Sequence, residues 1–150
     1  MKNVSFALIQ LSCDEDQSKN TEKTFSAIRN AASKGAQVIC LQELFQSVYF
    51  CYEENPSFFD LAQTIPGPLT NQLGDLAKEL GVVIVASMFE KRAAGIFHNT
   101  TAVIDADGQF LGKYRKMHIP DDPGYYEKYY FTPGDLGYLV FDTQYAKIGV

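Results

Sequence analysis

The chain has 150 residues, the length of one ordinary domain, with 46% apolar residues, 21% charged residues and a formal net charge of −5. This composition is typical of a folded protein and excludes a disordered or low-complexity one. The acidic balance argues against nucleic-acid binding by the whole surface, which needs an excess of Lys and Arg. The apolar run at residues 4–11 is too short for a membrane span and lacks the features of a signal peptide, so we expect no membrane association.

The first part of the chain alternates strand and helix patterns. Residues 4–11 predict a buried strand, and apolar residues at helical spacing predict a helix over residues 20–34, which Gly35 ends. Residues 36–41 are continuously apolar and predict a second strand, covered on both faces. This order predicts parallel pairing, and ligands of such sheets gather beyond the carboxyl ends of the strands, where Glu43 lies.

The rest of the chain continues the α/β pattern. An aromatic and acidic loop over residues 49–59 precedes a helix that Pro68 begins and Gly81 caps. Residues 82–90 predict a buried strand, residues 99–104 and 109–116 predict a hairpin turning at Asp107 and Gly108, and the last strands fall at 138–141 and 147–150. No linker or repeat divides the pattern. We predict one α/β domain whose sequence stops inside a core strand, and hence the N-terminal half of a larger domain.

The cysteines indicate the compartment and exclude some chemistry. Cys13, Cys40 and Cys51 form an odd set without CxxC spacing, so neither a disulfide framework nor a zinc site is supported. We therefore expect a cytoplasmic protein without a metal or other cofactor. Cys40 and Cys51 lie among apolar residues and are expected to be packed in the interior.

The segment KYRKMHIP concentrates cations at residues 113–120. Strand alternation places Lys116 and His118 on one side and Lys113 and Arg115 on the other, so the cations do not form one stripe for a nucleic acid. Sequence alone leaves two interpretations of Lys116, a functional cation or an ordinary solvated lysine. Glu43 is equally open, since acids near strand ends also serve in loop salt bridges.

Common catalytic motifs are absent from the sequence. It contains no GxSxG, HExxH, GxGxxG or P-loop pattern, and His98 and His118 do not form a metal-binding pair. Serine hydrolase, zinc enzyme and nucleotide-binding interpretations therefore lack support.

Four segments in this order resemble the nitrilase superfamily of carbon–nitrogen hydrolases: AQVICLQELF, GKYRKMHIPD, YYEKYYFTPGD and AKIGV. The resemblance covers essentially the whole chain. LQELFQSVYFCYEE and RKMHIPDDPGYYEKYYFTPGD are most similar to the N-carbamoylputrescine amidase branch. This resemblance implies a nitrilase-type αββα sandwich, incomplete in this chain, in a homo-oligomer that acts on a small carbamoyl amine.

The resemblance also implies site residues. Members of the superfamily use a Glu, Lys and Cys triad, often with a second glutamate. Glu43 matches the first acid, Lys116 the lysine, Glu127 the second glutamate, and His118 a histidine that lines the pocket of carbamoyl-cleaving relatives. None of the three cysteines matches the nucleophile, which in the superfamily follows IGV by a few residues, so we expect it beyond Val150.

Three further residues lie in the matched segments but are not assigned a catalytic role. Lys113 and Arg115 match no catalytic position and are expected to be outward-facing surface charges. Gln42 stands where most of the superfamily has a proline, which is a difference of the backbone.

The implied reaction is hydrolysis of N-carbamoylputrescine to putrescine, carbon dioxide and ammonia, a step of polyamine biosynthesis. Glu43 would act as general base, Lys116 would stabilise the oxyanion, and Glu127 would orient Lys116. Two alternatives stay open: another carbamoyl amidase such as a β-ureidopropionase, and a non-catalytic binding or assembly module. Acids that could bind the substrate ammonium are Glu53, Glu54, Asp121 and Asp122.

Overall fold

A five-stranded mixed sheet forms the centre of the molecule in a computed structural model that describes residues 3–150. The strands lie in chain order: β1 (Phe6–Ile9), β2 (Val38–Leu41), β3 (Val83–Ala93), β4 (Ile96–Ile104) and β5 (Phe110–Arg115). As predicted, β1, β2 and β3 pair in parallel. The pairs β3–β4 and β4–β5 are antiparallel.

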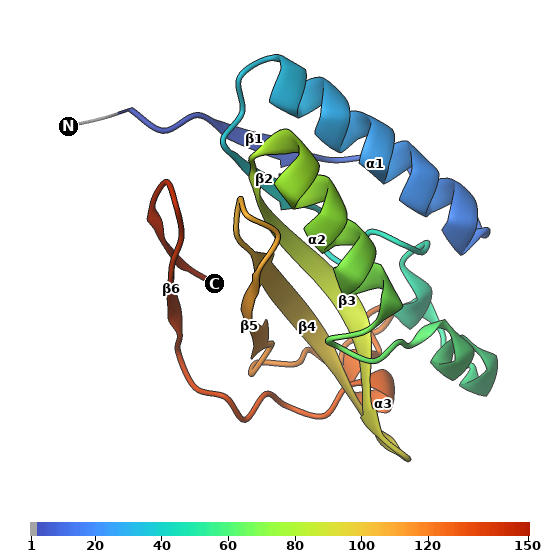
Figure 1. The fold of residues 1–150 in the computed structure, drawn as a ribbon. Coiled ribbons are helices and arrows are strands. Elements are labelled where there is room, and N and C mark those ends of the chain that lie inside the picture. Colours follow the sequence, from blue (N-terminus) through green and yellow to red (C-terminus); the bar gives the residue numbers. More distant parts are fainter. Residues whose placement is uncertain (1–2) are drawn as a thin grey trace.

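Two helices, α1 (Gln17–Ser33) and α2 (Pro68–Leu80), lie side by side over one face of the sheet (Figure 1). The helix α1 begins three residues before its predicted start because the side chain of Asp16 accepts a hydrogen bond from the Ser18 amide at 2.8 Å. Gly81, with φ of 63°, ends α2 in the left-handed conformation that its sequence predicts.

The main core lies between these helices and the sheet. It combines Ile28 of α1 and Leu73 of α2 with Ile39, Ile84 and Ile104 of three strands, all fully buried. Val38 and Val83, which point to the opposite face of β2 and β3, are buried as well. The prediction of strands covered on both faces is thus confirmed at these positions.

The opposite face is covered in part by a small antiparallel sheet of β6 (Val140–Asp142) and β7 (Lys147–Gly149), which Figure 1 shows apart from the five strands. Ile148 and Tyr145 pack there against Val38 and Val83. Within the described residues β7 pairs only with β6, so the predicted strand at residues 147–150 is confirmed over Lys147–Gly149, while its place in the core of a larger domain stays a prediction.

The segments around residues 50 and 130 build a second, aromatic core. The short helices η1 (Phe50–Tyr52) and η2 (Pro56–Leu61) replace much of the predicted loop over residues 49–59, and the short helix α3 (Glu127–Tyr130) lies against η1. Phe50 packs against Phe89 with 5.0 Å between ring centroids, and against Tyr130 at the same distance. Cys51 is fully buried in this cluster, as predicted, whereas Cys40 is only half-buried.

Two hairpins connect the antiparallel strands. The predicted β4–β5 hairpin is confirmed, with Gly108 at φ of 89° in its turn. The β3–β4 hairpin extends beyond both predicted strands to a turn at Ala94 and Gly95. The sequence did not predict this end because its residues are exposed and lack an apolar pattern. No helix in residues 3–150 is long and apolar enough to cross a membrane.

Candidate active site

Three segments far apart in the sequence bring Glu43, Lys116 and Glu127 together. Glu43 follows the carboxyl end of β2, Lys116 follows β5, and Glu127 begins α3. The Nζ atom of Lys116 lies 3.1 Å from Oε1 of Glu43 and 2.8 Å from Oε2 of Glu127. The ammonium group is therefore held between two carboxylates.

The backbone of Lys116 is fixed on both sides. Its amide donates to the Asn99 carbonyl oxygen at 2.9 Å, and its own carbonyl oxygen accepts from the Gly134 amide at 2.9 Å. Burial would lower the pKa of Lys116, but the hydrogen bonds to Glu127 and Glu43 raise the pKa above its ordinary value. The side chain is thus a positioned cation at neutral pH.

Glu127 is the buried member of this group, with 3% of its surface exposed. Its Oε2 accepts from Lys116, and its Oε1 accepts from the Tyr49 hydroxyl at 3.0 Å. Burial, together with the hydrogen bond to Glu127, raises the pKa of Tyr49, so the phenol stays a donor. Both oxygens of Glu127 are thereby occupied, which fixes the carboxylate toward Lys116.

Glu43 is the accessible member. Its Oε1 accepts from Lys116 and, at 2.6 Å, from Nδ2 of Asn99. A cavity of about 300 Å³ lies beside it, with Tyr49 and Cys13 in its wall. Gln42 donates to the Cys13 sulfur at 3.2 Å and accepts from the Leu11 amide, so the residue in the place of the usual proline joins β2 to this wall.

Sequence reasoning missed Asn99 and its neighbour Ser87, which is hydrogen-bonded to Asn99 at 3.2 Å. Both side chains are buried in central strands. A signal was available, since a serine interrupts the apolar run VVIVASMFE and a buried polar group requires a partner.

The other predicted site residues lie outside this contact set. His118, two residues past Lys116, is exposed, and no hydrogen bond or ion pair among the described residues joins it to Glu43, Lys116 or Glu127. The acids considered for the substrate ammonium are all exposed: Glu53, Glu54, Asp121 and Asp122.

The three cysteines have the character of structural thiols. Burial raises the pKa of Cys13, Cys40 and Cys51. A nucleophilic cysteine requires the opposite shift, toward the thiolate. This agrees with the expectation that the nucleophile is not among them.

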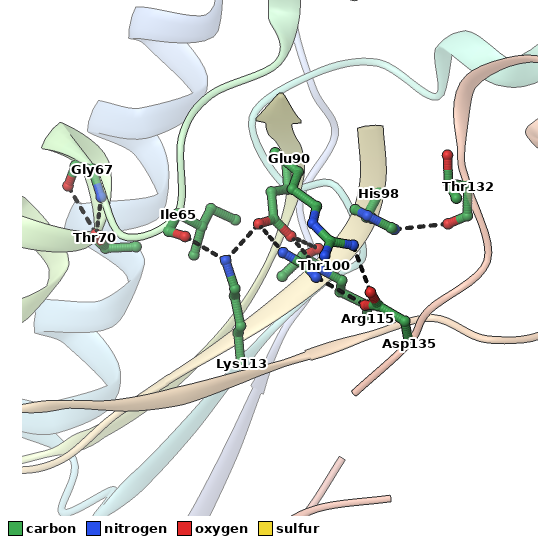
Figure 2. A network of polar contacts seen from close by, with 11 residues as sticks. Ile65, Gly67, Thr70, Glu90, His98, Thr100, Lys113, Arg115, Thr132 and Asp135 are labelled. Carbon is green, nitrogen blue, oxygen red and sulfur yellow. Dashed lines mark hydrogen bonds and ion pairs between the residues drawn. The ribbon is translucent and has the colours of Figure 1, made fainter. Parts of the chain in front are cut away.

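The prediction that Lys113 and Arg115 are outward-facing surface charges is wrong. Arg115 is 5% exposed and donates two hydrogen bonds of 2.8 Å to the buried Glu90, which also accepts from Lys113 and Thr100 (Figure 2). Strand alternation was predicted correctly, but the side opposite Lys116 faces the protein interior. Arg115 is therefore buried, and Lys113 half-buried, against a partner acid.

This cluster is electrostatically strong. Burial would raise the pKa of Glu90, but hydrogen bonds from Arg115, Lys113 and Thr100 lower the pKa to about 2. Arg115 also donates to Asp135 at 2.9 Å, which ties the segment after α3 to β5. The cluster thus anchors β5 from the side opposite the Lys116 side chain.

Comparison with known proteins identifies the family. The model of the carbon-nitrogen hydrolase family matches residues 5–150. The chain belongs to this family. Its similarity to the N-carbamoylputrescine amidase of Solanum lycopersicum is 51% identity over 98% of the chain and 49% of that protein. For the citrullinase of Francisella tularensis the identity is 46%, over 100% of the chain and 52% of that protein.

The crystal structure of a carbon-nitrogen hydrolase from Helicobacter pylori G27 has the same fold, with a TM-score of 0.92 and 42% identity over 97% of this chain and 50% of that one. The nitrilase-type fold and the family inferred from the four segments are confirmed. This carbon-nitrogen hydrolase chain spans about half the length of the curated relatives that it matches.

Proposed function

We propose that this chain is the N-terminal half of one carbon-nitrogen hydrolase domain that cleaves N-carbamoylputrescine to putrescine, carbon dioxide and ammonia. The observation that carries the proposal is the Lys116 ammonium between Glu43 and Glu127. The substrate is taken from the similarity to a plant N-carbamoylputrescine amidase.

The chemistry explains why such a group is needed. A carbamoyl amine is a poor electrophile, so its hydrolysis at neutral pH requires a strong nucleophile and a stabilised oxyanion. In this proposal a cysteine after residue 150 attacks the carbamoyl carbon, and Glu43 takes the thiol proton. The tetrahedral intermediate then expels putrescine, which leaves with that proton, and a carbamoyl thioester remains.

Water completes the reaction. Glu43 accepts a proton from the attacking water, the thiol is released, and the resulting carbamate decomposes to carbon dioxide and ammonia. In both steps Lys116 lies near the carbonyl oxygen that becomes negative. A fixed cation in a water-poor site lowers such a barrier by several kcal/mol, on the order of what one oxyanion-hole donor contributes.

A second carbamoyl substrate is favoured by one observation, the similarity to a citrullinase. Citrulline carries the same carbamoyl amine but an amino acid at its far end. The choice between the two substrates therefore depends on the residues that bind the far end of the substrate. They bind an ammonium alone in N-carbamoylputrescine, and an ammonium with a carboxylate in citrulline.

The test measures ammonia release by the complete protein encoded by the gene, with N-carbamoylputrescine, citrulline and 3-ureidopropionate as substrates. We expect the highest kcat/KM with N-carbamoylputrescine. A higher value with citrulline or 3-ureidopropionate would transfer the assignment to that substrate, and no ammonia from any of the three would overturn the proposal in favour of a binding or assembly module.

Site variants then assign the chemistry. Glu43→Gln keeps the shape of the side chain but cannot accept a proton, so we expect it to abolish turnover. Glu15→Gln changes an exposed acid before α1 and serves as the matched control, with activity equal to that of the unmodified protein. Turnover by Glu43→Gln at the level of the control would contradict the role of Glu43.

The remaining parts of the proposal concern the protein as a whole. We place it in the cytoplasm as a homo-oligomer, with His118 in the pocket wall and no cofactor. The free state of all three cysteines supports a reducing compartment. Light scattering, which measures the molar mass of the protein in solution, tests the homo-oligomer. The KM of the variant His118→Ala tests whether His118 lies in the pocket wall.

A further inference from the structure

A chain of hydrogen bonds connects the backbone amide of Leu44, the residue after Glu43, with the Glu43 carboxylate. The Leu44 amide donates to Oγ of Ser87 at 3.1 Å, the Ser87 hydroxyl donates to Oδ1 of Asn99 at 3.2 Å, and Nδ2 of Asn99 donates to Oε1 of Glu43 at 2.6 Å. Ser87 is 7% exposed and Asn99 is 3% exposed. Three hydrogen bonds, two of them buried and the third part-buried, thus connect the backbone at the end of β2 with the acid that it carries.

The direction of this chain is determined at its start. A backbone amide can only donate, so the Leu44 N–H occupies a lone pair of Ser87 and leaves the hydroxyl proton for Asn99. Oδ1 of Asn99 accepts that proton, and the amide nitrogen is therefore turned toward Glu43. The opposite orientation would place a carbonyl oxygen against a carboxylate oxygen.

The two oxygens of Glu43 consequently differ. Oε1 accepts from both Asn99 and Lys116, whereas no group in residues 3–150 donates to Oε2. A carboxylate oxygen that already holds two donors is a poor proton acceptor. Oε2 has its lone pairs available for a proton.

The backbone at this point is also unusual. Leu44 has φ of 52°, the left-handed region that costs a residue with a side chain on the order of 1 kcal/mol or more. Such a conformation persists where surrounding contacts determine it, and here the Leu44 amide is bonded to Ser87. The turn and the chain of hydrogen bonds therefore support each other.

We infer that Asn99, oriented by Ser87, is a positioning residue that holds Oε1 of Glu43 and presents Oε2 as the basic oxygen. This inference rests on the proposed function, because it assigns the atom of Glu43 that takes the thiol proton. Lys116 alone cannot do this, since its ammonium group is shared with Glu127.

The first experiment compares Asn99→Ala, Ser87→Ala and Thr101→Ala in the complete protein. Thr101 is the matched control, because it lies two residues from Asn99 on the same face of β4 and is half-buried. For Asn99→Ala we expect a roughly 10- to 100-fold lower kcat, as for a lost hydrogen bond to a charged group, with little change of KM.

Ser87→Ala should lower kcat by a smaller factor, again with little change of KM, because it frees the orientation of Asn99 and leaves its amide in place. It also keeps the inference testable if Asn99→Ala does not fold. An unchanged kcat in Ser87→Ala and in any folded Asn99→Ala would overturn the inference, and so would an equal loss of kcat in Thr101→Ala.

A second readout separates the inference from the proposed function. The ¹³C signal of the Glu43 carboxyl carbon should change at neutral pH in the Asn99 or Ser87 variant and stay unchanged in Thr101→Ala, whether or not the protein turns over a carbamoyl amine. If no substrate is hydrolysed but the signal changes, the proposed function fails and the positioning role stands. If hydrolysis depends on Glu43 but the signal does not change, the positioning role fails alone.

Discussion

Glu127 and Glu43 both accept a hydrogen bond from the Lys116 ammonium. Glu127 is buried, whereas Glu43 is open to the cavity. Burial lowers the pKa of Lys116, but the hydrogen bonds to these two acids raise it by more. The charge of Lys116 therefore depends on both acids. The buried acid cannot exchange this partner for water. Glu127 is therefore expected to control the protonation of Lys116 more than it controls binding.

The variant Glu127→Gln tests this dependence. It keeps the size of the side chain but removes the negative charge, so the lysine loses its proton at lower pH. We expect the alkaline limb of the kcat profile to move to lower pH and kcat to fall roughly 10- to 100-fold. Glu22→Gln, an exposed acid of α1, serves as the control. An alkaline limb that stays in place would contradict the assignment.

The Glu90 cluster makes a separate prediction about stability. The pKa of Glu90 is about 2 in the folded chain and 4.5 for an unperturbed glutamate. Since the folded value is the lower one, the contribution is present above about pH 4.5 and is lost as pH falls toward 2. It amounts to roughly 3 kcal/mol of the free energy of unfolding.

Urea unfolding at a series of pH values measures this contribution. Glu90→Gln should flatten the profile between about pH 5 and 2, and at neutral pH it should lose about 3–5 kcal/mol because the buried Arg115 keeps only the exposed Asp135 as a counter-charge. The same slope in the variant and in the unmodified protein would show that Glu90 does not carry the effect.

Individual residues show how much of the candidate site could be predicted from the sequence. The resemblance selected Glu43, Lys116 and Glu127, and the structure brings all three into contact. Alternation correctly separated Arg115 from Lys116, but it does not tell which side of a strand faces solvent. That depends on Glu90, a residue 25 positions away that supplies the buried counter-charge.

At the scale of elements, the segment after α3 is hydrogen-bonded to Lys116, which follows β5, and to β4. The Gly134 amide donates to Lys116, and the Thr132 amide donates to the Phe97 carbonyl oxygen at 2.8 Å. A Cβ atom at residue 134 would collide with the backbone of Arg115. The glycine therefore allows this segment to lie against the residue next to Lys116.

Gly134→Ala should push this segment away from β5. We expect a loss of stability of roughly 1–3 kcal/mol, as for other overpacked sites, and a lower kcat because the Lys116 carbonyl loses its partner. Thr132→Ala changes an exposed side chain of the same segment and should have little effect on either. Thermal unfolding and kcat measure both effects, and a Gly134 variant as stable and active as the Thr132 variant would contradict the close approach.

Elements differed in how well their sequences predicted them. The helix α2 was predicted at both ends because Pro68 and Gly81 act locally. The strand β7 was predicted by its apolar residues, but its pairing with β6 depends on contacts between segments, which a local pattern does not encode. The same limit applies to the exposed end of the β3–β4 hairpin.

The molecule as a whole has an open region along β1, an edge strand of the sheet. Phe6 is 57% exposed and Leu8 is 82% exposed, although both belong to the apolar run of that strand. A soluble monomer rarely leaves large apolar side chains beside unpaired strand edges. Since the chain spans about half of its relatives, we expect further protein to cover this region.

Residues 1–150 expressed alone should therefore self-associate. Light scattering over a range of concentrations is expected to show growing particles, and the double variant Phe6→Ser, Leu8→Ser should reduce their size. Ser26→Ala, a change on the exposed side of α1, is the control and should not. A stable monomer at all concentrations would contradict the expectation.

The strand β5 and the residue that follows it carry two charge systems on opposite sides, with Lys113 and Arg115 bonded to Glu90 and Lys116 bonded to Glu43 and Glu127. Inserting or deleting one residue would exchange the two faces, so that each cation would meet the wrong acid. Length changes in this strand are thus far more damaging than most substitutions. We expect insertions and deletions that arise during evolution to accumulate in the turn at Asp107 and Gly108, and β5 itself to change only by replacement of residues.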